Sequence, residues 1–179
     1  MIPPQVWVIG FPRCGTVSLC DALTILGWTP LHNPRHWDML EGYNAAADVF
    51  ITAHWRELFE MFPDDKFILN TRDLESWLQS LQRIPGFWKS RLLYDRYHRL
   101  KVYGTEDVSD HQTLTSIWEE HHREVSATIP SDQLLKLSLP FSWKPLCEFL
   151  QVPTPDQPFP WKNKKTHSDA VIRRVTQQM

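Results

Sequence analysis

The chain has 179 residues, of which 22% are charged and 42% hydrophobic, as in an ordinary globular domain. Its formal net charge of −2 argues against the broad basic surface that nucleic-acid binding requires, but it is compatible with a local basic pocket for a small anion. The composition therefore predicts one compact domain, residues 1–179, whose ligand is a small molecule and not a nucleic acid.

The cysteines and the apolar runs of the sequence indicate the cellular compartment in which the protein is expected. The three cysteines, Cys14, Cys20 and Cys147, cannot all pair, and their spacing matches neither a zinc site nor a disulfide framework. The first strand-like run begins at residue 6, which leaves no space for a signal peptide ahead of it, and no apolar run reaches the length of a membrane span. We therefore expect a cytoplasmic protein without a membrane span.

The first half of the chain opens with a strand and a helix. Residues 6–9 form a short, wholly apolar run, which predicts a central parallel strand covered on both faces. Residues 16–26 repeat apolar side chains at helical spacing and end at a glycine, which predicts a helix. Residues 30–47 predict irregular structure, and residues 54–62 predict a helix ended by a proline.

A second strand and helix follow. Residues 66–70 predict a strand, and residues 73–81 begin with the acidic side chains that favour a helix N-terminus. Arg72 is therefore expected at a strand-to-helix junction, where open α/β sheets bind their ligands.

The remaining segments continue the alternation. They are a helical lid over residues 83–108, a long helix over 110–128, a third strand over 134–138, a helix over 143–150, a Pro-rich surface loop over 152–160 and a short helix over 168–178. Alternation of this kind predicts an α/β fold with three layers, α/β/α, and a mainly parallel sheet.

The turn after the first strand carries a phosphate-binding pattern. Residues 10–16 have the two glycines of a Walker A loop at the correct separation, between strand and helix. The N–H groups of such a loop, together with the positive end of the helix, hold a phosphate. The usual lysine is absent, and Arg13 is the cation that the loop offers. A glycine turn that merely joins strand to helix is the alternative interpretation.

Residues 10–19 resemble the 5′-phosphosulfate-binding loop of sulfotransferases that use PAPS (3′-phosphoadenosine 5′-phosphosulfate), in the variant form with arginine at the usual lysine position. The resemblance implies a P-loop sulfotransferase-like fold. It also implies nucleotide contacts from Arg13, Cys14, Gly15, Thr16, Val17 and Ser18. Cys14 stands where the family usually has serine or threonine, which affects its side-chain contact but not the backbone cradle.

Residues 66–80 resemble the 3′-phosphate motif of the same family, in which an arginine ends a strand and a serine follows eight positions later. The resemblance assigns Arg72 and Ser80 to the 3′-phosphate. The alternative for Arg72 is an ion pair with Asp73 or Glu75, and Trp77 is expected to pack in the core.

Further segments resemble a sparsely characterised branch of sulfotransferase-like proteins, namely residues 63–69, 143–150 and 158–163. In the wider superfamily a basic C-terminal loop also touches the 3′-phosphate. The loop over residues 152–167 therefore supplies three candidates by position, Lys162, Lys164 and Lys165. A solvated basic tail is the alternative.

The resemblance implies transfer of a sulfuryl group from PAPS to a hydroxyl or amine of a small-molecule or glycan acceptor, with PAP as the product. An in-line displacement of this kind needs a base, a cation near the leaving oxygen and correct positioning, and it needs no metal. Arg13 is the candidate that stabilises the leaving phosphate.

Three residues between the two phosphate motifs are candidates for the base: His54, His32 and Asp48. His54 is preferred because residues 49–54 loosely resemble a Lys-Thr-His strand end that carries the catalytic histidine in cytosolic sulfotransferases. An imidazole also titrates near neutral pH. Packing is the alternative for the histidines, and helix capping or a surface position is the alternative for Asp48.

Two other functions stay open. A P-loop kinase or NTPase would use Thr16 to hold magnesium, although the missing lysine counts against it. A noncatalytic nucleotide-binding protein would keep the same fold. The sequence does not identify the acceptor.

Overall fold

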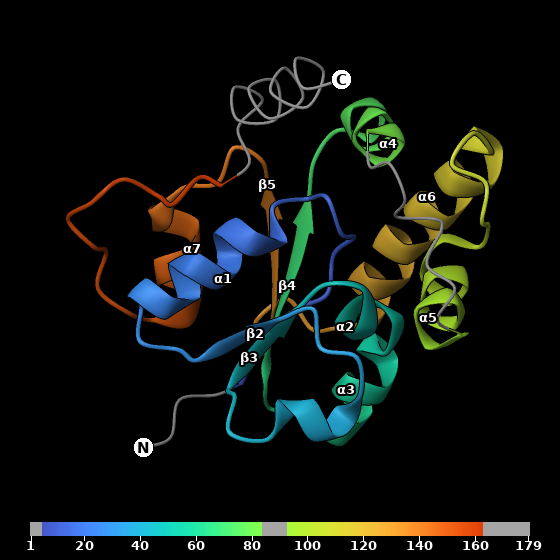
Figure 1. Cartoon of the computed structure of the whole chain (residues 1–179). Helices are drawn as coiled ribbons and strands as arrows, with labels where there is room; N and C mark the ends of the chain where they lie inside the picture. Colours follow the sequence, from blue (N-terminus) through green and yellow to red (C-terminus); the bar gives the residue numbers. More distant parts are fainter. Residues whose placement is uncertain (1–4, 84–92, 163–179) are drawn as a thin grey trace, which may run out of the picture.

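A single parallel sheet forms the centre of the computed structural model, which describes residues 5–83 and 93–162 (Figure 1). Its strands are β1 (Val6–Val8), β2 (Pro30–His32), β3 (Ala45–Ala47), β4 (Lys66–Thr71) and β5 (Leu134–Ser138). They lie in the order β2-β3-β1-β4-β5, and all four pairings are parallel. The prediction of a three-layer α/β/α fold is confirmed.

Helices cover both faces of this sheet (Figure 1). The described part of the chain has α1 (Thr16–Ile25), α2 (Val49–Ala53), α3 (Trp55–Met61), α4 (Leu74–Gln82), α5 (Leu93–Tyr103), α6 (His111–Thr128) and α7 (Trp143–Leu150). One face packs against α1 and α7, and the other against α2, α3 and α6. None of the helices described is both long and apolar enough to cross a membrane.

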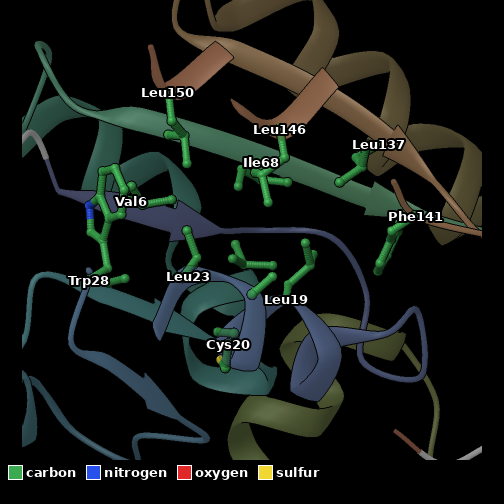
Figure 2. Packing of buried hydrophobic residues seen from close by; sticks show 14 of the residues in the cluster. Val6, Leu19, Cys20, Leu23, Trp28, Ile68, Leu137, Phe141, Leu146 and Leu150 are labelled. Atoms are coloured by element: carbon green, nitrogen blue, oxygen red, sulfur yellow. The ribbon is translucent and has the colours of Figure 1, made fainter. Parts of the chain in front are cut away.

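The two faces of β1 belong to different hydrophobic clusters because successive side chains of a strand point in opposite directions. Val6 and Val8 face α1 and α7, whereas Trp7 faces the cluster of α2, α3 and α6. Figure 2 shows Leu19 and Leu23 of α1 directed at the first of these clusters. With both faces covered, the apolar run at residues 6–9 forms a central strand, as the sequence predicted.

A third hydrophobic cluster lies at the carboxyl end of the sheet. Phe11, which follows β1, packs against Trp77 of α4 with ring centroids 5.0 Å apart and against Trp118 of α6 at 5.3 Å. Tyr103 of α5 and Cys14 complete this cluster. The turn after β1 is therefore anchored by α4, α5 and α6 together.

The prediction of irregular structure over residues 30–47 was wrong. This stretch contains β2, β3 and a 3-10 helix, η1 (Trp37–Leu40). Both strands have only three residues, and β3 is made entirely of alanine, which has little strand propensity. Alanine is tolerated there because β3 is fully buried between β1 and β2.

The strand end expected over residues 49–54 was also wrong, since Val49–Ala53 is helix α2. Asp48 begins this helix by accepting a hydrogen bond from the N–H of Val49 over 2.7 Å. The lid predicted over residues 83–108 contains helix α5, which packs on α2 and α6. The helix predicted over residues 168–178 lies outside the described residues.

Candidate nucleotide-binding site

The candidate site lies at the carboxyl ends of β1 and β4, where the connections from two neighbouring strands lead to opposite sides of the sheet. The connection after β1 leads to β2 on one side, and the connection after β4 leads to β5 on the other. The carboxyl ends of β1 and β4 are neighbours, with Val8 opposite Ile68. Open α/β sheets bind ligands in the crevice at such a switch point. The two motifs identified in the sequence follow these two strands.

The loop after β1 ends in a left-handed residue that starts α1. Gly15 is the N-cap residue with φ 81°, and Arg13 also has a positive φ of 72°. A Cβ at Gly15 would lie 2.5 Å from Cε2 of Phe141, so both the backbone conformation and the space require glycine. The first N–H groups of α1, from Thr16 to Ser18, have no acceptor one turn earlier in the helix and mark its positive end.

Buried side chains from neighbouring elements hold this loop. Asn70 of β4 is completely buried; its Oδ1 accepts from the N–H of Gly10 over 3.0 Å, and its Nδ2 donates to the carbonyl of Cys14 over 3.0 Å. Thr52 donates to the carbonyl of Gly10 over 2.8 Å, and His121 bonds to the carbonyl of Ile9 over 2.9 Å. Sequence reasoning missed Asn70, Thr52 and His121 as supports of the loop. The one available signal was a polar Asn70 at the end of an apolar strand.

Cys14 contributes to the loop through its backbone. Its side chain has no exposed surface and packs in the cluster with Phe11 and Trp77. Burial raises the pKa of the Cys14 thiol far above its usual range, although Arg72 and Arg13 partly oppose this, so the thiol stays neutral. Any contact between Cys14 and a ligand must therefore come from its main chain.

Arg72 lies at the junction between β4 and α4, as the sequence predicted. Its Nη1 donates to the carbonyl of Arg13 over 3.1 Å, while its buried Nε has no hydrogen-bond partner among the described residues. Asp73, the alternative partner, instead caps α4 by accepting from the N–H of Ser76 over 2.8 Å. Ser80 of α4 accepts a hydrogen bond from Nε of Arg13 over 3.2 Å. Arg13, Arg72 and Ser80 are thus brought together.

Three more predicted residues meet at the ends of β1, β2 and β3. The Nε2 atom of His32 lies 2.9 Å from Oδ2 of Asp48 and 3.1 Å from Oγ1 of Thr16. The Thr16 hydroxyl also lies 3.5 Å from the same Asp48 oxygen. Asp48 has φ 92° and ψ −169°, a backbone conformation that is almost restricted to glycine. Strained residues of this kind concentrate at functional sites.

His54 lies in a different cluster. It joins the end of α2 to α3, with Nδ1 3.1 Å from Oε1 of Glu57 and Nε2 3.1 Å from Nε2 of His98 on α5. Lys101 of α5 bonds to Glu57 over 2.8 Å. Burial lowers the pKa of His54, the positive charge of Lys101 lowers it further, and the bond to Glu57 opposes both. The structure therefore ties His54 to α5, and it does not place it beside Thr16, His32 and Asp48.

The C-terminal loop reaches α1. The backbone N–H of Lys162 donates to Oγ of Ser18 over 3.0 Å, and Nζ of Lys162 lies 3.6 Å from Oδ2 of Asp21. Lys162 therefore lies beside the first turn of α1. Lys164 and Lys165 lie outside the described residues.

A pocket of about 270 Å³ opens between α2, α3, α5 and α6. Its walls include Phe11, Thr52 and His121, so it adjoins the residues that hold the start of the loop. Charged side chains of both signs also line it, from Arg56, Lys101, Glu120 and Glu124. Within the two described ranges, no group of three or more His, Cys, Asp or Glu side chains could hold a metal ion.

The comparison with known families agrees with this geometry. The sulfotransferase domain family matches residues 5–38 and 33–168 of the chain, and the protein belongs to this family. The chain is also similar to the protein described as "Ava biosynthesis cluster protein M" from Aspergillus versicolor. The two are 28% identical over an alignment of 225 positions, which covers 95% of this chain and 86% of the relative. The family prediction is confirmed.

Proposed function

We propose that this protein is a PAPS-dependent sulfotransferase that transfers a sulfuryl group to a hydroxyl or amine of a small-molecule or glycan acceptor. The observation that carries the proposal is the pairing of two anion-binding features across one switch point. The N-terminus of α1 follows β1, and Arg72 with Ser80 follows β4. A nucleotide with phosphates at both its 5′ and 3′ positions matches two such features on neighbouring strands.

The residues present suit a bisphosphate nucleotide. The N–H groups of Thr16, Val17 and Ser18 would hold the 5′-phosphosulfate at the positive end of α1. The Nε of Arg72, which has no partner among the residues that the structure describes, and the hydroxyl of Ser80 would hold the 3′-phosphate. PAPS, when bound, supplies an activated sulfuryl group. The acceptor then needs a residue that removes its proton.

We propose His32 as that base, with Asp48 as its positioning residue. The distance of 2.9 Å between Nε2 of His32 and Oδ2 of Asp48 is that of a hydrogen bond. We assign the ring hydrogen to Nε2, which then donates the hydrogen bond to the carboxylate of Asp48. The Nδ1 atom of a neutral His32 ring then keeps its lone pair. The side chain of His32 is 35% exposed, so an acceptor can reach it, whereas Asp48 at 15% is more enclosed.

One observation favours a second candidate, a magnesium-dependent kinase or NTPase. Thr16 and Asp48 are the residue types that hold magnesium in P-loop NTPases, and their side-chain oxygens are 3.5 Å apart. However, the imidazole of His32 contacts both of them, and the loop lacks the lysine that follows the second glycine of a Walker A motif, since Thr16 follows Gly15 directly. These two features support the sulfotransferase.

Binding and transfer experiments separate the two candidates. Titration calorimetry of the full chain with PAP in EDTA should show stoichiometric binding. Incubation with radiolabelled PAPS and a panel of phenols, sugars and amines in EDTA should label an acceptor, because Arg13 and the helix terminus supply the positive charge that magnesium supplies in NTPases. Absence of PAP binding, combined with magnesium-dependent ATP turnover, would establish the kinase or NTPase instead.

A further inference from the structure

We infer that the pocket between α2, α3, α5 and α6 is a binding site for a small, neutral, aromatic molecule that donates one hydrogen bond from an O–H or N–H group to Nδ1 of His121. The inference goes beyond the proposed function, because it does not depend on which nucleotide the protein binds. Thr16, His32 and Asp48 do not line this pocket, so it is separate from the cluster that contains the proposed base.

The protonation state of His121 is the first argument. The residue is only 9% exposed, and its Nε2 lies 2.9 Å from the carbonyl oxygen of Ile9. A carbonyl oxygen can only accept a hydrogen bond, so Nε2 carries the ring hydrogen. Burial lowers the pKa of His121 to about 4, which keeps the ring neutral near pH 7. The Nδ1 atom therefore keeps its lone pair and can accept a hydrogen bond.

The surroundings of this nitrogen are the second argument. Within the described ranges, no side chain or main-chain group donates a hydrogen bond to Nδ1 of His121. The atom is not fully buried, so solvent reaches it, and the ring that carries it lines the pocket. The ring is held between Phe11 and Trp55, whose centroids lie 4.8 Å and 6.1 Å from its own. The pocket thus contains one acceptor in a fixed orientation.

The charged side chains of the pocket favour a neutral ligand. Each of them already has a partner of opposite sign on the protein. The pairs are Arg56 with Glu124, Lys101 with Glu57 over 2.8 Å, and Glu120 with Arg123 over 3.5 Å. An ionic ligand would have to compete with one of these pairs, whereas a neutral ligand leaves all of them intact.

The size and the apolar part of the pocket suit an aromatic ring. Its apolar lining comes from Phe11, Ala53, Trp55, Val102 and Ile117. A cavity of about 150 Å³ accommodates benzene. The volume of about 270 Å³ therefore accommodates a substituted ring or two fused rings, which can pack against the aromatic side chains. Indole has this size, is neutral and carries a single N–H donor.

The test compares two ligands of nearly the same shape, indole and benzofuran, of which only indole has a donor. Titration calorimetry of the full-length wild type measures the Kd of each. One hydrogen bond to Nδ1 predicts that indole binds roughly 3–10-fold more tightly than benzofuran. NMR spectra that detect imidazole nitrogens should show the Nδ1 resonance of His121 move when indole is added. The resonances of His36, an exposed histidine outside the pocket, should stay in place.

A variant that fills the pocket tests its location. Ile117→Trp enlarges a half-buried side chain of the lining and should abolish the binding of both ligands. Leu78→Trp is the matched control, because Leu78 is also half-buried but lies on α4 outside the pocket, and it should bind indole normally. A thermal midpoint within a few degrees of the wild type verifies that each variant is folded.

The ligand comparison and the Nδ1 resonance use the wild type, so they decide the inference even where Ile117→Trp does not fold. Absence of indole binding, equal affinity for indole and benzofuran, or an unmoved Nδ1 resonance would each overturn it. Undiminished indole binding in a folded Ile117→Trp would overturn it as well. None of these outcomes depends on the binding of PAP.

Discussion

Asn70 donates a hydrogen bond from its side-chain amide to the carbonyl oxygen of Cys14 over 3.0 Å, in the fully buried interior. The same amide accepts from the N–H of Gly10, so one side chain of β4 fixes both the first residue of the loop and the residue before its second glycine. The separation between the end of β1 and the start of α1 is set by this contact.

Replacement of Asn70 by alanine should destabilise the chain and disturb nucleotide binding together. The N–H of Gly10 and the carbonyl of Cys14 would lose their buried partner, which costs roughly 2–4 kcal/mol of unfolding free energy. Urea denaturation gives this value, and PAP titration should show a weaker Kd. Asn44→Ala is the matched control, because Asn44 accepts a bond from the N–H of Thr29 away from the loop. A normal PAP affinity in a destabilised Asn70→Ala would show that the loop does not depend on this contact.

The base can be located by comparing turnover in three variants. His32→Ala should lower kcat by roughly 10²–10⁴-fold while leaving PAP affinity nearly unchanged. Asp48→Asn should cause a smaller loss, since asparagine can still accept the bond from Nε2 of His32. His54→Ala should keep near-normal turnover because its ring contacts Glu57 and His98. The opposite pattern, with His54→Ala inactive and His32→Ala active, would assign the base to His54.

His121 should make the stability of the protein depend on acid. Burial lowers the pKa of His121 from 6.5 to about 4, and the nearby charges of His122 and Arg56 add to this effect, while the bond to the Ile9 carbonyl opposes it. A pKa lowered by folding means that the unfolded chain binds the proton more readily. The stability contribution is therefore complete above pH 6.5 and is lost as the pH falls toward 4.

The complete loss, reached below pH 4, is about 3 kcal/mol. Urea denaturation at pH 7.5, 6.0 and 5.0 would measure the upper part of it, which is about 2 kcal/mol by pH 5.0. His121→Gln keeps a donor for the Ile9 carbonyl but cannot titrate, so its midpoint should vary less over this range. His36→Gln, at an exposed histidine, should leave the variation intact. Identical slopes for the wild type and His121→Gln would contradict the assignment.

The attachment of α5 should also weaken in acid. The pKa of His54 is lowered by burial and by Lys101, so its neutral form is the one that the packed helix accommodates. Its contribution is present above pH 6.5 and is lost as the pH falls below that value. The global loss at His121 lowers protection in every element, so the test is a difference between elements. Hydrogen-exchange protection factors of the α5 amides should decrease between pH 7.5 and 5.5 by more than those of α7.

The matched variant for this experiment is His54→Phe. Phenylalanine keeps the aromatic packing on Phe50 and Trp37, whose ring centroids lie 4.7 Å and 5.2 Å from that of His54, but it cannot titrate. The protection of α5 should then fall with pH no more than that of α7. An unchanged pH dependence in His54→Phe would exclude His54 as its source.

The sequence predicted the elements whose signals are local. The run at residues 6–9 and the acidic start of α4 each contain enough information to define an element. β3 does not, because three alanines become a strand only when β1 and β2 enclose them. Residues 49–53 have the apolar, partly β-branched character of a strand and became a helix because Asp48 caps them.

In the candidate site, too, the sequence predicted only those parts whose signals lie within one segment. The loop and the Arg72–Ser80 pair were predicted because each is a contiguous motif. The pairing of His32 with Asp48 was not, since it depends on β2 and β3 ending side by side, and these strands were not predicted. The supports of the loop, Asn70 and His121, come from segments far apart in sequence, 56 and 112 residues from the groups they bind.

The two halves of the proposed nucleotide site differ in their tolerance of mutation. At the start of α1 the donors are main-chain N–H groups, which every residue except proline carries, so point mutations at Val17 or Ser18 leave the donors in place. Beside α4 the proposed donors are side chains, and a single codon change at Arg72 or Ser80 removes one of them. Evolutionary change in nucleotide preference is therefore expected to begin at the 3′ half, while the 5′ half persists through sequence drift.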